Sequence, residues 1–243
     1  MLPKPAVVVF NIENTLAASF QALTAACRQL CHGVYGDHLA QVDPLALASS
    51  IERNRVWFWS DPKRAARAQH DIHGARGEFV CRAMIQIGLD CVEITESFAH
   101  DCFRLQRQLM RLFPHSEHIL RQLNQAGIRH GIIYRSPDEP AHSVLREQDF
   151  RTFFEHIVGS EHTPADRRGG LVERCLELFQ VDAADTCLVS NRLRSDVEPA
   201  VEMGLLSIWV NLPRSGQRPG DPLRPDHIIS STADLVPLLL ERA

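Results

Sequence analysis

The sequence contains no apolar stretch that approaches the ~20 consecutive residues a helix needs to span a bilayer. Its amino terminus also lacks a basic segment followed by an apolar one and a cleavage site, which is the pattern of a secretory signal. These absences argue against insertion into a membrane and against export. We therefore expect a soluble, cytoplasmic protein that has no membrane partner.

The chain also lacks an excess of one charge, because 26 Lys and Arg stand against 30 Asp and Glu, for a formal net charge of -4. No basic face of the kind that binds phosphate backbones is expected, so nucleic acid is not a predicted partner. Seven cysteines occur, an odd number, and none has the paired Cys-x-x-Cys spacing of structural zinc sites. Their mostly apolar surroundings predict reduced thiols in the core.

The second half of the chain alternates between apolar, strand-like runs and segments with helical spacing. Predicted strands lie at residues 128–134, 156–160, 187–190, 205–211 and 227–229, and predicted helices at 115–125, 140–148, 171–179, 197–203 and 233–240. Strands separated by single helices are typical of right-handed βαβ units. The pattern therefore predicts an α/β fold with a doubly wound, mostly parallel sheet.

A long helical region separates the first strand from this alternation. Residues 17–110 show apolar positions at three- and four-residue spacing and few strand signals. The region is far longer than the dozen or so residues that a crossover needs. We predict an α/β core of residues 1–16 and 111–243, with a helical cap of residues 17–110 inserted after the first strand; the alternative is that the insertion only enlarges the core.

The first strand ends in polar residues. A β-branched and apolar run over residues 6–10 is followed by Asn11, Glu13 and Thr15, as expected of a buried parallel strand at the carboxyl edge of a sheet, where open α/β folds bind ligands. The segment over residues 11–16, Asn-Ile-Glu-Asn-Thr-Leu, resembles the Asp-x-Asp-x-Thr-Leu signature of the haloacid dehalogenase superfamily of hydrolases. The resemblance implies a Rossmann-like core.

This resemblance puts Asn11 at the position of the nucleophilic aspartate, Glu13 at the acid/base position and Thr15 among the ligand-binding residues. An amide oxygen is a much poorer nucleophile than a carboxylate, and it brings no charge to a metal ion. The resemblance therefore predicts the fold and at the same time predicts altered chemistry.

The second motif of the superfamily supplies a Thr or Ser hydroxyl to the transferring phosphoryl group. Here the strand ends in Tyr134-Arg135-Ser136. By position Tyr134 replaces the hydroxyl residue, and Ser136 is the alternative catalytic hydroxyl, with Arg135 as a ligand-binding neighbour. Ser136 followed by proline is equally consistent with an ordinary helix N-cap.

The third motif normally supplies a lysine, and residues 160–168 contain none. Thr163 takes its place if the following proline sets the alignment, and Arg167 or Arg168 does so if the distance to the next helix sets it. An arginine keeps the positive charge and binds anions through its planar fork. We assign a catalytic role to Arg167 and a ligand-binding role to Arg168; the alternative is a solvated loop pair.

In the fourth motif the family's phosphatases carry Gly-Asp and, five residues later, a second Asp, and these carboxylates hold Mg²⁺. This chain has Ser190, Asn191 and Asp196, so the spacing is kept and one acid is lost. Ser-Asn also resembles the 2-haloacid dehalogenases of the superfamily, which use no metal. We expect Ser190 to bind ligand, Asn191 and Asp196 to bind Mg²⁺ weakly if at all, and no other cofactor.

Two functional hypotheses follow from the four altered motifs. The first is a pseudoenzyme of the hydrolase superfamily, which has lost the standard phosphatase chemistry and binds a small anionic ligand or a protein partner. The second is an active hydrolase of a phosphate ester or another small substrate, in which Glu13 acts as general base on water. In either case the resemblance implies that the cap sets specificity, through Trp57, Trp59, Arg53 and Arg55 if these line its inner face; we favour ordinary packing for them.

Overall fold

The computed structural model describes residues 4–89, 92–134, 148–159, 169–211 and 224–240. The chain forms two compact units, Met1–Ala18 with Leu112–Ala243, and Ser19–Arg111, and each is described here by itself. None of the helices in the described residues is both long enough and apolar enough to cross a membrane.

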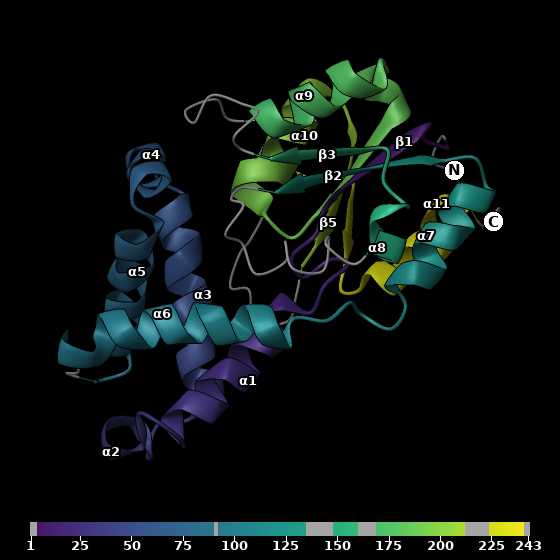
Figure 1. The fold of residues 1–243 in the computed structure, drawn as a ribbon. Helices are drawn as coiled ribbons and strands as arrows, with labels where there is room; N and C mark the ends of the chain where they lie inside the picture. The colour runs from purple at the N-terminus through teal and green to yellow at the C-terminus, as the bar shows by residue number, and fades with distance from the viewer. Residues whose placement is uncertain (1–3, 90–91, 135–147, 160–168, 212–223, 241–243) are drawn as a thin grey trace. The chain divides into compact units, whose positions relative to one another are not determined.

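The first unit, Met1–Ala18 with Leu112–Ala243, is built around a six-stranded sheet in the order β3-β2-β1-β4-β5-β6 (Figure 1). Every neighbouring pair is parallel. The strands are β1 Val7–Asn11, β2 Arg129–Tyr134, β3 His156–Gly159, β4 Thr186–Ser190, β5 Leu206–Val210 and β6 His227–Ile229. Its helices are α7 Ser116–Gln125, α8 Gln148–Arg151, α9 Gly170–Phe179, α10 Glu198–Met203 and α11 Leu235–Leu240, and a π-helical turn, Leu193–Val197, precedes α10.

Both faces of the sheet carry helices. In Figure 1, α9 and α10 lie on one side of the strands and α7 and α11 on the other. Val7 and Val9 of β1 share a buried cluster with Val172 and Phe179 of α9, whereas Phe10 points to the opposite face because successive side chains of a strand alternate. The expected doubly wound α/β fold is confirmed.

The second unit, Ser19–Arg111, is entirely helical in its described residues. It contains α1 Ser19–Cys31, α2 Gly36–Leu39, α3 Pro44–Trp59, α4 Pro62–His70, α5 Ile72–Gln86 and α6 Val92–Leu109. Its buried core includes Leu23, Ile51, Phe79 and Phe98.

Local sequence explains where several of these helices begin. Asp43 accepts hydrogen bonds from two backbone N–H groups at the start of α3. Asp61 accepts one from the backbone N–H of Arg64 in α4. Each aspartate precedes a proline, which is well suited to the first helical position because it has no N–H to satisfy. Trp57 and Trp59 pack against the core of this unit, in agreement with the favoured interpretation.

The predicted strands are all found in the structure. Helix α1 begins at Ser19 and not at residue 17, because Ala17 forms β-bridges with Glu13 and Leu112. The predicted helix over residues 140–148 lies almost entirely outside the described residues.

Candidate functional site

The carboxyl ends of β1 and β4 meet at the point where the strand order reverses. From β1 the chain adds β2 and β3 on one side, and then returns to add β4, β5 and β6 on the other. Phe10 pairs with Val189, so the next residues, Asn11 and Ser190, end the two strands side by side. In open α/β sheets this switch point is where ligands bind.

A tight turn follows β1 and fixes the polar residues beyond it. The backbone N–H groups of Leu16 and Ala17 donate to the carbonyl of Ile12, and Asn14 adopts a left-handed conformation with φ of 58°. Asparagine tolerates this region better than most residues. The Thr15 hydroxyl donates to the carbonyl of Asn11 and so closes the turn onto the end of the strand.

The turn is also supported by the first residue of α7 and by the segment before α11. The Thr232 hydroxyl donates to the carbonyl of Thr15 over 2.7 Å, and the Ser116 hydroxyl donates to the carbonyl of Leu16 over 2.7 Å. His115 lies 3.1 Å from Thr232 through its Nε2, and burial lowers the pKa of His115. Thr15 therefore has a structural role in this turn.

Asn11 is buried, with 1% of its surface exposed. Within the described part of the chain neither its Oδ1 nor its Nδ2 has a hydrogen-bond partner. An unsatisfied buried polar group costs about 1–3 kcal/mol. A ligand that offered both an acceptor and a donor to this amide would remove that cost.

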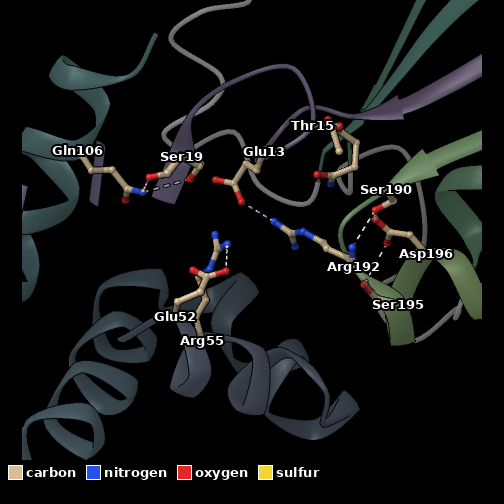
Figure 2. A network of polar contacts seen from close by, with 11 residues as sticks. Glu13, Thr15, Ser19, Glu52, Arg55, Gln106, Ser190, Arg192, Ser195 and Asp196 are labelled. Atoms are coloured by element: carbon tan, nitrogen blue, oxygen red, sulfur yellow. Dashed lines mark hydrogen bonds and ion pairs between the residues drawn. The ribbon is translucent and has the colours of Figure 1, made fainter. Parts of the chain in front are cut away.

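Glu13 forms an ion pair with an arginine that the sequence analysis did not assign to the site. Its side chain is 0% exposed, and its Oε2 accepts a hydrogen bond from Nη2 of Arg192 over 2.8 Å (Figure 2). Arg192 follows β4 by two residues, as Glu13 follows β1 by two residues. The sequence signal for Arg192 is its place two residues after a strand, which matches that of Glu13, because a buried carboxylate needs a cation nearby.

The turn after β4 is held by hydrogen bonds to Asp196. The Ser190 hydroxyl donates to Oδ2 of Asp196 over 2.8 Å, and the Ser195 hydroxyl donates to Oδ1 over 3.0 Å (Figure 2). The backbone N–H of Arg192 donates to the Ser190 hydroxyl over 3.0 Å. Ser190 and Asp196 therefore lie together at the site, and both help to shape this turn.

Of the remaining residues assigned to the site, Asn191 and Tyr134 lie within the described part of the chain. Asn191 accepts a hydrogen bond from Trp209 Nε1 over 3.3 Å through its backbone carbonyl, and its buried Oδ1 has no partner in the described residues. Tyr134 is buried at the end of β2. Arg135, Ser136, Thr163, Arg167 and Arg168 lie outside the described residues.

The described oxygen donors at this edge are the amides of Asn11 and Asn191 and the carboxylates of Asp196 and Glu13. Mg²⁺ in proteins is usually bound through one or two carboxylates together with substrate oxygens and water. Here Asn11 and Asn191 offer neutral amides, and both oxygens of Asp196 already accept hydrogen bonds from serine hydroxyls. Across the described residues, no group of three or more His, Cys, Asp or Glu side chains is arranged to hold a metal.

Comparison with known proteins identifies the family. Residues 6–204 match the haloacid dehalogenase-like hydrolases, and the chain belongs to this family. The resemblance seen in the sequence is therefore confirmed.

Two curated relatives are phosphatases. The chain is 29% identical over 102 residues to glyceraldehyde 3-phosphate phosphatase of Pyrococcus abyssi, a match that spans 41% of this chain and only 42% of that protein. It is 20% identical over 199 residues to phosphoglycolate phosphatase of Pseudomonas putida, spanning 79% of this chain and 72% of the relative.

Among solved structures, a dehalogenase determined with an intermediate complex matches the whole chain. The match covers 100% of both chains with a TM-score of 0.71 and 16% sequence identity. At this level of identity the likeness supports the fold alone.

Proposed function

We propose that this protein binds a small anionic molecule at the ends of β1 and β4 and does not carry out the magnesium-dependent phosphatase reaction of its family. The observation that carries the proposal is the buried, unpartnered amide of Asn11 in the described residues. Its NH₂ group can donate hydrogen bonds to an anion. Its lack of charge removes the repulsion that an aspartate would exert on the same anion.

The contact made by Glu13 supports the same conclusion. A general base must reach the proton that it removes, within about 2.6–3.2 Å. Oε2 of Glu13 instead accepts a hydrogen bond from Arg192 over 2.8 Å. Use of this oxygen as a base would require the ion pair to open, so the geometry favours binding over hydrolysis by Glu13.

The class of ligand is suggested by the relatives. Their names, glyceraldehyde 3-phosphate phosphatase and phosphoglycolate phosphatase, both denote action on small phosphate esters. We propose that the site accepts phosphorylated molecules of this size and holds them without cleavage. We propose that this binding needs no Mg²⁺, because the amides of Asn11 and Asn191 carry no negative charge that a metal ion would have to offset.

The test compares hydrolysis and binding in three proteins: the wild type, Asn11→Asp, and the control Asn14→Asp. Asn14 is a buried neighbour in the same turn, so its substitution introduces the same chemical change away from the nucleophile position. Hydrolysis of an aryl phosphate and of 2-phosphoglycolate is measured with Mg²⁺ and with a chelator. Binding of inorganic phosphate is measured by calorimetry in metal-free buffer.

We expect the wild type to bind phosphate and to show no Mg²⁺-stimulated turnover above a no-enzyme control. Asn11→Asp should weaken metal-free phosphate binding by about tenfold or more, because it adds a negative charge next to the anion. Asn14→Asp should weaken it less. Wild-type turnover that disappears with a chelator, or with Glu13→Gln, would overturn the proposal, and so would the absence of any phosphate or phosphoglycolate binding at millimolar concentration.

A further inference from the structure

The charged groups at the ends of β1 and β4 have different partners. Both oxygens of Asp196 accept hydrogen bonds from serine hydroxyls of its own turn. Arg194, in the same turn, has a side chain that is 58% exposed and lies 2.6 Å from Glu198. Arg192 is only 13% exposed and reaches across to Glu13 after β1. Arg192 therefore places a largely buried positive charge between the two strand ends.

We propose that Arg192 binds the anion at this site and that Glu13 is a positioning residue, which holds the guanidinium in place. This inference rests on the proposed function. A guanidinium carries five N–H donors in a rigid fork, so it can hold a carboxylate and a bound anion together. Arg192 then supplies the positive charge that the third motif normally provides as lysine, and that the sequence analysis assigned to Arg167 and Arg168.

The backbone on each side of the ion pair is held in place. The N–H of Arg192 is bonded to the Ser190 hydroxyl, and Leu193 and Val197 pack against Trp209 just beyond it. Glu13 forms a β-bridge with Ala17 inside the turn after β1. A charge held in advance in this way binds a ligand with less loss of conformational entropy.

Arg192→Met, Arg192→Lys and the control Arg194→Met test the assignment. Binding of inorganic phosphate is measured by calorimetry, and near-ultraviolet circular dichroism reports whether each variant is folded. We expect Arg192→Met to weaken phosphate binding by about thirtyfold or more, because charge-assisted hydrogen bonds to phosphate are among the strongest. Arg192→Lys should retain part of the affinity, and Arg194→Met should stay within about twofold of wild type, since its charge is exposed to solvent.

Glu13→Gln tests the positioning role, because it keeps the shape and the acceptor oxygen while it removes the negative charge. We expect the affinity for phosphate to fall by about threefold to tenfold, since an amide oxygen holds the guanidinium less strongly than a carboxylate does. A purely structural role of Glu13 would leave the affinity of the folded variant unchanged. An affinity that is unchanged or higher in Glu13→Gln would overturn the positioning role.

The outcomes separate this inference from the proposed function. If the wild type binds neither phosphate nor phosphoglycolate, the proposed function fails. If the wild type binds phosphate and folded Arg192→Met binds it equally well, only the role of Arg192 fails. If Arg192→Met does not fold, Arg192→Gln replaces it, because an unchanged affinity for phosphate in that folded, neutral variant would also overturn the assignment.

Discussion

The buried histidine of β2 should make the stability of the protein fall as the pH is lowered. His130 is 2% exposed. Its ring meets Phe10 and Phe154 edge-on, with centroids 6.2 and 6.5 Å away, and its Nδ1 lies 3.3 Å from the carbonyl of Phe153. Burial lowers the pKa of His130 from 6.5 to about 4, although the hydrogen bond to Phe153 acts in the opposite direction.

The direction of the pH effect on stability follows from the number of protons that the folded and unfolded chains bind. Between pH 6.5 and about 4 the unfolded chain binds a proton at His130 and the folded chain does not, so the free energy of unfolding decreases as the pH falls through this range. Going from pH 7.5 to pH 5.5 should cost about 1.3 kcal/mol from this residue alone. The full difference in pKa sets a limit of about 3.4 kcal/mol, which is approached only below pH 4.

The assay is urea denaturation at a series of pH values from 7.5 to 5.5, for the wild type, His130→Asn and His118→Asn. An asparagine at position 130 can still donate a hydrogen bond to the carbonyl of Phe153 but does not titrate. The variant should therefore lose about 1.3 kcal/mol of the pH dependence, whatever its absolute stability. His118, on α7, is exposed, so His118→Asn is the control for the loss of a histidine. This control variant should keep the wild-type pH dependence. Equal pH dependence in His130→Asn and in wild type would refute the reasoning.

Two further predictions concern the metal donors and the packing of the sheet. The double variant Asn11→Asp with Asn191→Asp places three carboxylates together, counting Asp196. Their mutual repulsion should lower the free energy of unfolding without metal, and Mg²⁺ at a hundred times its Kd should restore about 2.7 kcal/mol. An unfolding midpoint that does not change across millimolar Mg²⁺ would show that these side chains do not converge. A Cβ added at Gly131 would lie 2.7 Å from Cε2 of Phe179 on α9, so Gly131→Ala should destabilise the protein by about 1–3 kcal/mol in urea denaturation. Adding Phe179→Leu should relieve part of that cost, and strictly additive effects of the two substitutions would contradict the packing argument.

Most of the fold is encoded in local patterns. The apolar run ending at Asn11 and the alternation of strands with helices predict a parallel sheet, because a βαβ unit is specified by periodicity and by short connections. Helix starts are also local, as at Asp43 and Asp61, each followed by proline. The turn after β1 is a further case, since Asn14 and Thr15 close it through hydrogen bonds within a few residues.

The candidate site depends on contacts between strands that lie far apart in the sequence. The strand order places β4 beside β1, and only then does Arg192 reach Glu13, 179 residues away along the chain. The burial of His130 likewise arises when separate segments pack together. The residue types at the strand ends follow from the chain alone, because each strand and turn is specified by its neighbours in sequence. Which of their charges meet follows only from the packing of the strands, because ion pairing and desolvation depend on distance in space.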